Sequence, residues 1–166
     1  MRVCGIDPGL NTSGYAVVES DGATTSVCDA GVCRSGAGTD IAERLARIEA
    51  DFASLFEQWR PGVVAVEQLY AHYKHPRTAI LMGHARGVML ATAVRLGCPV
   101  RSYSATQVKR FLTGNGRASK QQVQRAVTAA RGLGCGPEPP DVADALAIAL
   151  CCAYDLRGKL REVRVP

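Results

Sequence analysis

Two carboxylates close short apolar segments of the sequence. Asp7 ends a run that begins at Arg2, and Pro-Gly, a strong turn signal, follows at once. Glu67 ends the wholly apolar run 63–66. If the two runs are neighbouring parallel strands, their last residues lie about 4.8 Å apart at one edge of the sheet. At that spacing each carboxylate raises the pKa of the other unless a cation lies between them, so the pair favours metal binding over two separate surface residues.

Two further carboxylates open the last apolar segment. Asp141 and Asp144 stand three residues apart at the start of a helix predicted over 141–150, so they share one face. The first turn of a helix favours negative charge, and capping alone accounts for one Asp. A second Asp on the same face, heading an Ala-rich helix that must pack closely on the sheet, indicates a role in a site.

Four carboxylates converge only where cations neutralise them. Clustered oxygen ligands suit Mg²⁺ or Mn²⁺ rather than zinc. Two such ions per site, about 3.5–4 Å apart, suit phosphodiester hydrolysis, because they activate a water and steady the leaving oxygen. In that scheme Asp7 bridges the ions while Glu67, Asp141 and Asp144 complete both sites, so these four residues are the predicted catalytic and metal-binding set.

The basic residues are concentrated in the middle of the chain. The formal net charge is +5, but residues 68–137 contain no Asp or Glu at all. A charge run is usually a solvated face, yet so long a stretch of one sign within a folded domain favours a polyanionic partner, nucleic acid first.

An aromatic and basic loop follows Glu67 directly. Tyr70 and Tyr73 are predicted to stack on unpaired bases, with Lys74 and Arg77 at the phosphates.

A second basic group lies further along the chain and is predicted to contact DNA as well. It consists of Lys109 and Arg110 in a short predicted helix, Arg117 in the loop after it, and Lys120 in the first turn of the next helix. A cation in a first turn gains nothing from the helix dipole, and a phosphate bound at that terminus would explain Lys120.

The segments between these residues alternate in a pattern typical of an α/β fold. Antiparallel strands are predicted over 2–7, 13–20 and 24–34, and strands reached by helical crossovers over 63–67 and 98–103. Helices are predicted from Ile41 to Pro61-Gly62 with an Asp40 cap, over 78–96, over 105–112, after a Ser119–Gln122 capping box, and over 141–150. We expect one nuclease domain over 1–156 and a basic tail over 157–166.

The helix predicted over 78–96 carries small residues at every fourth position, namely Ala79, Gly83, Gly87 and Ala91. Glycine weakens a helix, so this spacing indicates close approach by another backbone. The partner is either the sheet of the same domain or the same helix of a second subunit, and the sequence leaves both open.

Composition excludes several other classes of protein. No apolar run is long enough to span a bilayer, and the N-terminus lacks the pattern of a signal peptide, so we expect a cytoplasmic protein without membrane contact. The seven cysteines are odd in number and lack zinc-ligand spacing, which argues against a disulfide framework or a zinc site.

The ordered motifs resemble those of the RuvC Holliday junction resolvases over nearly the whole chain. They are Gly5-Ile6-Asp7-Pro8-Gly9, Val66-Glu67-Gln68, Gln107-Val108-Lys109, Ser119-Lys120 and Asp141-x-x-Asp144-Ala-Leu-Ala-Ile-Ala. The resemblance implies an RNase H-like fold with a five-stranded mixed sheet, of three antiparallel and two parallel strands, flanked by helices. It also implies a homodimer that resolves a four-way DNA junction by paired symmetric nicks, alongside a branch-migration complex of the RuvA and RuvB type.

The same resemblance carries over to individual residues. It implies metal binding by Asp7, Glu67 and the two acids of the last helix, and it places Lys109 and Lys120 near the scissile strand. Tyr70 stands where the family has a Phe that stacks at the branch point, so the identity of the inserting aromatic, and the sequence preference at the cut, stay open. Alternatives are an RNase H-like nuclease acting on structured RNA and an inactive junction-binding protein; an actin-like ATPase would need two such domains.

Overall fold

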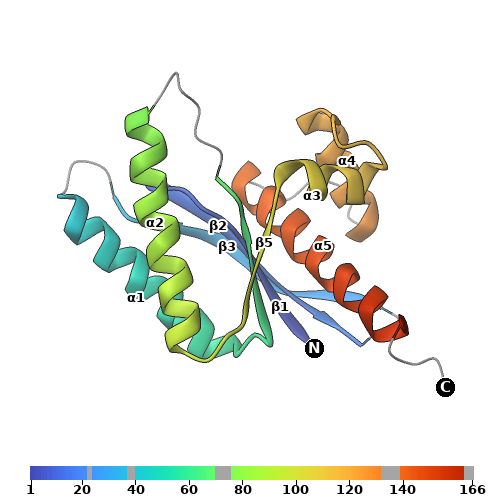
Figure 1. The fold of residues 1–166 in the computed structure, drawn as a ribbon, viewed down its shortest axis with the longest axis horizontal. Helices are drawn as coiled ribbons and strands as arrows, with labels where there is room; N and C mark the ends of the chain where they lie inside the picture. The colour runs from blue at the N-terminus through green and yellow to red at the C-terminus, as the bar shows by residue number, and fades with distance from the viewer. Residues whose placement is uncertain (22–23, 37–39, 70–75, 132–138, 163–166) are drawn as a thin grey trace.

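The computed structural model describes residues 1–21, 24–36, 40–69, 76–131 and 139–162. Five strands form one mixed sheet in the order β3-β2-β1-β4-β5 (Figure 1). The β1–β2 and β2–β3 pairs are antiparallel, and the β1–β4 and β4–β5 pairs are parallel. This arrangement confirms the predicted sheet. Its strands are β1 (Arg2–Asp7), β2 (Thr12–Ser20), β3 (Thr25–Arg34), β4 (Val63–Glu67) and β5 (Val100–Tyr103).

Helices cover both faces of the sheet. One face packs on α1 and α2 and the other on α3, α4 and α5, which lie on opposite sides of the strands in Figure 1. Because side chains alternate along a strand, β4 is apolar on both faces and reads as a continuous hydrophobic run. The helices are α1 (Ile41–Trp59), α2 (Pro76–Arg95), α3 (Ala105–Thr113), α4 (Lys120–Arg131) and α5 (Pro140–Glu162).

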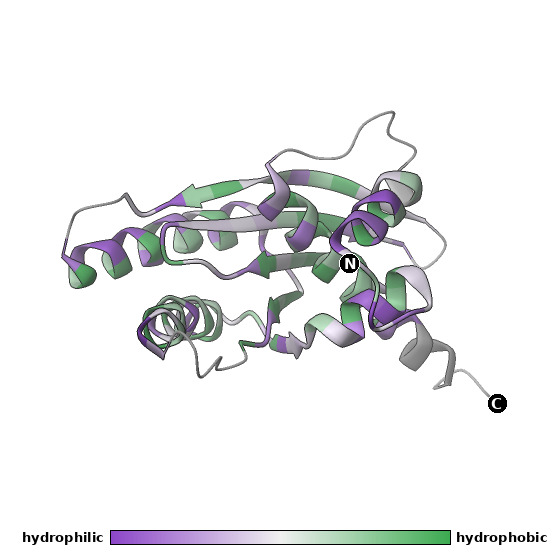
Figure 2. Ribbon diagram, turned by 90° about the horizontal axis from the view of Figure 1, so that it is seen from above, coloured by the Kyte–Doolittle hydropathy of each residue, from purple (hydrophilic) through white to green (hydrophobic). Residues whose placement is uncertain are grey.

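Helix α1 forms as its apolar spacing predicts. Asp40 caps it, accepting a hydrogen bond from the Ala42 N–H at 3.0 Å, and Phe52 and Phe56 are fully buried against the sheet. Hydrophobic and hydrophilic residues alternate along this helix at the left of Figure 2. The chain leaves the helix at Arg60, which adopts a left-handed conformation with φ of 44°, just before the predicted Pro-Gly stop.

Helix α5 is longer than predicted. The sequence places its end at residue 150, whereas the helix continues to Glu162 and so crosses the predicted domain boundary at residue 156. Arg157, the first residue of the predicted tail, donates hydrogen bonds to Ser20 and Thr25 and to the carbonyl of Thr24. These contacts hold this turn of the helix against the β2–β3 hairpin, which local sequence patterns do not reveal.

The remaining element ends differ from prediction by one or two residues. Helix α2 begins at Pro76 rather than at residue 78, because proline is well suited to the first position of a helix. Strand β5 begins at Val100 rather than at Cys98, although the carbonyl of Pro99 still accepts a hydrogen bond from Val64 N–H at 2.8 Å. No helix within the described part of the chain is long and apolar enough to cross a bilayer.

Candidate active site

The parallel pairing of β1 and β4 brings the first two carboxylates together. The register runs from Val3 opposite Val63 to Ile6 opposite Val66, so Asp7 and Glu67 are the next residues at the carboxyl ends of both strands. Alternation along each strand directs both side chains to the face that carries α5. The Asp7 carboxyl, when protonated, donates a hydrogen bond to Glu67.

Helix α5 reaches this edge because two glycines leave room for its backbone. A Cβ on Gly5 of β1 would overlap the carbonyl oxygen of Ala145, and a Cβ on Gly14 of β2 would overlap that of Asp141. Gly14 is also the residue that pairs with Asp7 across the β1–β2 ladder. The start of α5 is therefore seated beside Asp7, and both of its acids act electrostatically on that residue.

The cluster of acids shifts the proton equilibria of its members. Burial, followed by the negative charges of Glu67 and Asp144, raises the pKa of Asp7 to about 8. Burial also raises the pKa of Glu67, while the Asp7 hydrogen bond and the charges of Lys109 and Lys120 act in the opposite direction. Asp7 thus holds a proton at neutral pH unless a cation takes its place.

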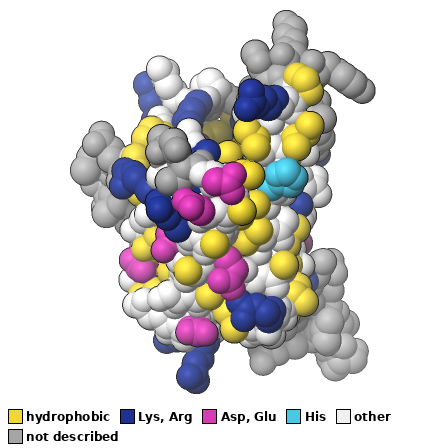
Figure 3. All heavy atoms as spheres, turned by 90° about the vertical axis from the view of Figure 1, so that its left-hand side faces the viewer, with side chains coloured by type: hydrophobic (Ala, Val, Ile, Leu, Met, Phe, Trp, Pro, Cys, Tyr) yellow, Lys and Arg dark blue, Asp and Glu magenta, His cyan; other side chains and the backbone are white. Residues whose placement is uncertain are grey.

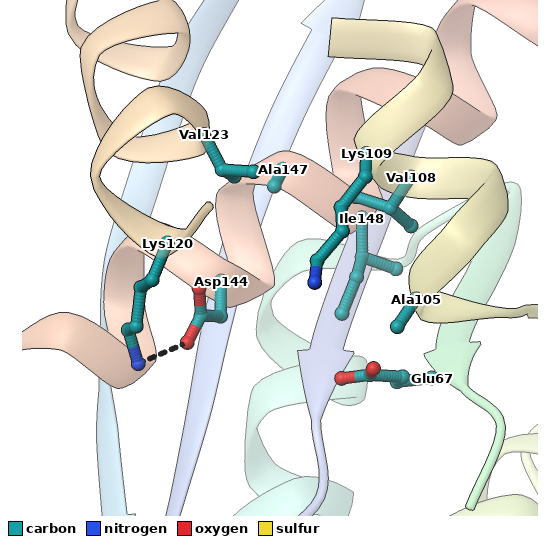
Figure 4. A pocket seen from close by; sticks show the side chains of 9 residues that line it. All are labelled: Glu67, Ala105, Val108, Lys109, Lys120, Val123, Asp144, Ala147 and Ile148. Atoms are coloured by element: carbon teal, nitrogen blue, oxygen red, sulfur yellow. Dashed lines mark hydrogen bonds and ion pairs between the residues drawn. The ribbon is translucent and has the colours of Figure 1, made fainter. Parts of the chain in front are cut away.

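A pocket of about 240 Å³ opens beside these acids between α3, α4 and α5. Glu67 and Asp144 lie at its acidic side, Lys109 and Lys120 project toward them, and Val108 and Ile148 contribute to its apolar lining (Figure 4). Lys120 Nζ forms an ion pair with Asp144 at 3.0 Å, and this hydrogen bond raises the pKa of Lys120. The ammonium groups of Lys109 and Lys120 therefore lie beside the acids, where they are available to bind an anionic substrate.

The donor set fits a hard divalent cation. All four side chains offer oxygen ligands. The charges of Glu67, Asp141 and Asp144 raise the pKa of Asp7, so a divalent cation would relieve the mutual repulsion of the acids. Among the described residues, however, no three His, Cys, Asp or Glu side chains stand close enough as a group to hold an ion. Asp144 is instead paired with Lys120, whose ammonium neutralises part of the charge.

The other residues predicted to contact DNA are placed less directly. Arg110 of α3 and Arg117, in the loop before α4, are exposed, as is Arg77 in the first turn of α2, and none of the three lines the pocket. Tyr70, Tyr73 and Lys74 lie outside the described residues. Of the described members of this group, Lys109 and Lys120 are the two that line the pocket with the acids.

Comparison with known proteins assigns the chain to a family. A family model described as crossover junction endodeoxyribonuclease RuvC matches residues 3–152. The chain belongs to the RuvC family.

Individual RuvC proteins match along nearly all of their length. The crossover junction endodeoxyribonuclease RuvC of Rhodopirellula baltica is 49% identical over 152 residues, which are 92% of this chain and 85% of that protein. Its counterpart from Heliobacterium modesticaldum is 44% identical over 156 residues, 94% of this chain and 96% of that one. A T. thermophilus RuvC, solved in complex with a Holliday junction substrate, is 36% identical with a TM-score of 0.89 and 96% coverage of both chains. These neighbours confirm the RNase H-like class of fold.

Sequence reasoning missed the structural roles of three residues at this RuvC-family site. Gly5 and Gly14 seat α5, and Arg86 of α2 donates hydrogen bonds to the carbonyl of Glu67 and to Ser102 Oγ. A glycine within a strand can signal close backbone approach, and that signal was available at both positions. Nothing in the sequence distinguishes Arg86 from the other arginines of the acid-free stretch.

Proposed function

We propose that this chain cleaves four-way DNA junctions through a divalent-metal site built on Asp7, with paired symmetric nicks in recombination and repair. Membership of the RuvC family makes it a structure-selective endodeoxyribonuclease. The observation that supports the site assignment is that acids from β4 and α5 act together on Asp7 of β1, whose pKa rises to about 8. Such a concentration of negative charge destabilises the fold unless a bound cation neutralises it, and it is therefore typical of a functional site.

The residues have distinct tasks in this proposal. Asp7, on which the other three acids act electrostatically, would hold Mg²⁺ or Mn²⁺ together with Glu67, Asp141 and Asp144. When bound, the ions supply activation of the attacking water and stabilisation of the leaving oxygen. The chain itself orients the carboxylates through strand register and through the seat of α5 on the glycines of the sheet.

Lys109 and Lys120 would act on the scissile phosphodiester. Both line the pocket that contains Glu67 and Asp144, and both lower the pKa of Glu67, so their positive charge reaches the acids. If Asp144 served as a metal ligand, Lys120 would lose this ion-pair partner, and its ammonium group would be available to a phosphate oxygen. Such a cation stabilises the negative charge that develops during in-line displacement.

Further contacts to DNA fall to the exposed basic and aromatic residues. Arg110 is exposed on α3, Arg117 is exposed on the loop that follows α3, and Arg77 is exposed in the first turn of α2. Tyr70, Tyr73 and Lys74 are proposed for the unpaired bases and phosphates at the branch point, on the strength of their sequence alone.

A homodimer through α2 would place two such sites on one junction. Among the described residues nothing lies within 4 Å of a Cβ added at Gly83 or Gly87, which favours a second subunit over the domain's own sheet as their partner. On the same helix Ile80 and Val94 are 60% and 65% exposed. Figure 3 shows hydrophobic side chains gathered on this side of the molecule. An exposed apolar stripe around glycines is typical of helices that pack closely across a two-fold axis.

The cellular setting follows from the proposed reaction. We assign the protein to the cytoplasm, where it would act after a branch-migration complex of the RuvA and RuvB type has moved the junction. The domain assignment, a nuclease domain over 1–156 with a basic tail over 157–166, is retained as a proposal in the same way.

The decisive experiment is incubation of the protein with a synthetic mobile four-way junction and Mg²⁺ or Mn²⁺. We expect paired nicks on a denaturing gel, ligatable product duplexes, and no cleavage by an Asp7→Asn variant that still binds the junction in a gel shift. Cleavage by the variant would overturn the metal assignment. Wild-type binding without cleavage would make the protein an inactive junction binder, and activity confined to RNA hairpins would assign it to structured RNA.

A further inference from the structure

Arg86 joins helix α2 to the strand end that carries Glu67. Its Nε donates a hydrogen bond to the main-chain carbonyl of Glu67 at 2.9 Å, and its Nη2 donates to Ser102 Oγ at 2.7 Å. Ser102 pairs with Val66 in the β4–β5 ladder, so the two acceptors belong to neighbouring strands at the same edge of the sheet. One guanidinium therefore fixes the ends of both strands to a single point on α2.

This contact comes from the face of the sheet opposite the acids. The Glu67 side chain points toward α3, α4 and α5, whereas Arg86 approaches from the α1–α2 layer. The Arg86 neighbours Ala85 and Met89 are fully buried in the core of that layer, so the helix itself is firmly seated. The planar guanidinium presents its donors in a fixed geometry, which transmits the position of the helix to the strand end.

The chain just beyond β4 has few other contacts, among the described residues, that hold it in place. Beyond Glu67 the strand keeps one more hydrogen bond, from Gln68 N–H to the Tyr103 carbonyl at 2.8 Å. Gln68 and Arg86 also line an open groove of about 450 Å³ between this edge and α2, with Gly83 and Gly87 on its wall. The glycines contribute no side chains there, and the Arg86 side chain is what joins α2 to the ends of β4 and β5 across this groove.

We propose that Arg86 is a positioning residue for metal binding, holding the main chain of Glu67 so that its carboxylate faces Asp7. This inference rests on the proposed function, since it assigns to Glu67 the role of a metal ligand. Lys109 and Lys120 act on the charge of the Glu67 carboxylate from the pocket side. Arg86 acts on the geometry of the same residue through its carbonyl group. Residues that support metal ligands in this indirect way typically change metal affinity by 10–100-fold when they are replaced.

The test compares Arg86→Met with a matched arginine on the same helix. Arg95→Met removes an equally long cationic side chain, whose partner is Glu49 on α1, far from the acids. Hydrogen exchange of residues 63–69 is measured by mass spectrometry in EDTA, and Mn²⁺ affinity by the electron paramagnetic resonance signal of the free ion. We expect exchange in Arg86→Met to be about fivefold faster, as for one lost hydrogen bond, and Mn²⁺ binding to be about tenfold weaker. Arg95→Met should change neither.

Two further variants keep the test sharp if Arg86→Met folds poorly. Ser102→Ala removes only the second acceptor, and Arg86→Lys keeps the charge without the two-point geometry, so both should show smaller shifts in the same direction. Wild-type exchange and Mn²⁺ affinity in the Arg86 variants, or full retention by Arg86→Lys, would overturn the proposal. If Arg95→Met changed the exchange rate and the Mn²⁺ affinity as much as Arg86→Met does, the role of Arg86 would be only to stabilise α2, and the proposal would be wrong.

The proposal and the proposed function fail in different ways. Exchange in EDTA depends on neither metal nor DNA, so it reports on Arg86 even if the wild type never cleaves a junction. If cleavage is observed, the Mg²⁺ concentration for half-maximal rate should rise about tenfold in Arg86→Met, with little change in the rate at saturating Mg²⁺ or in junction binding in EDTA.

Discussion

The Asp7 side chain is half-buried, and the negative charges of Glu67, Asp141 and Asp144 act on its carboxyl group. Its pKa rises from the ordinary 3.8 to about 8 on folding. The folded chain therefore binds a proton at Asp7 more tightly than the unfolded chain does. Protonation stabilises the fold fully below about pH 4, and this contribution is lost as the pH rises toward 8.

An Asp7→Asn variant should accordingly be more stable than the wild type in EDTA. The amide resembles the protonated acid and carries no charge, so its advantage grows between pH 4 and 8 and levels off above that range. We expect about 1–3 kcal/mol at pH 8, less than the full shift implies because Asp7 is only partly buried, and close to zero at pH 4. Urea denaturation at the two pH values measures the difference.

Divalent metal supplies the control for this prediction. Mg²⁺ or Mn²⁺ should raise the stability of the wild type and leave Asp7→Asn nearly unchanged, since only the wild type gains binding energy in the folded state. A variant that is less stable than the wild type at pH 8 would contradict the repulsion inferred around Asp7.

Helix α5 determines whether the four acids meet. Its first turns lie directly on the sheet, with the Asp141 carbonyl against Gly14 and the Ala145 carbonyl against Gly5. The Ala-rich sequence gives the helix a thin face, and the missing Cβ atoms give the sheet a matching recess. Packing of backbone on backbone thus sets the distance between the acids of the helix and those of the strands.

Gly14→Ala should unseat this end of the helix. The added methyl group would overlap main-chain atoms of Asp141, which cannot move aside by a change of side-chain rotamer. We therefore expect the free energy of unfolding to fall by about 1–3 kcal/mol and cleavage to be lost. Gly31→Ala on β3 is the matched control, because the nearest atoms to its methyl group belong to the movable side chain of Tyr15. Thermal denaturation and junction cleavage of both variants test this. Equal activity of the two would show that α5 tolerates displacement.

At the scale of the whole molecule, one face of α2 is left uncovered by the other described residues. Gly83 and Gly87 lie on this face with no described neighbour within 4 Å of an added Cβ, and Ile80 and Val94 extend it along the helix. Inside a single subunit these glycines only weaken the helix. Their presence is explained if a second copy approaches them closely.

The double variant Gly83→Ala, Gly87→Ala separates the two effects. Alanine favours the helix by roughly 0.5–1 kcal/mol at each position and meets open space, so the dilute monomer should melt at a higher temperature. The same methyl groups would hold a second copy apart and weaken the dimer by tenfold or more, or ~1.4 kcal/mol. Sedimentation across a concentration series measures the second effect. A dimer of unchanged affinity would place the interface elsewhere.

Local patterns in the sequence accounted for most of the elements. The apolar runs that end at Asp7 and Glu67, the stripe of α1 and the Ser119–Gln122 capping box all appear where they were predicted. Each depends on residues close together in the chain, whose side chains alone fix the period or the cap. The pairing of the first two acids was also predictable, because a buried apolar strand after a helical crossover lies parallel to its neighbour.

Contacts between distant segments could not be obtained in this way. Three features depend on residues far apart in the chain. They are the extension of α5 to Glu162, the ion pair of Lys120 with Asp144, and the hydrogen bonds of Arg86 to the strand ends. The sequence singled out the side chains that are proposed to carry the chemistry, since residue type and spacing are local properties. The distances between these side chains, their protonation and the hydrogen bond from Arg86 to the Glu67 carbonyl depend on how the helices pack on the sheet. That packing is determined only when the whole chain has folded.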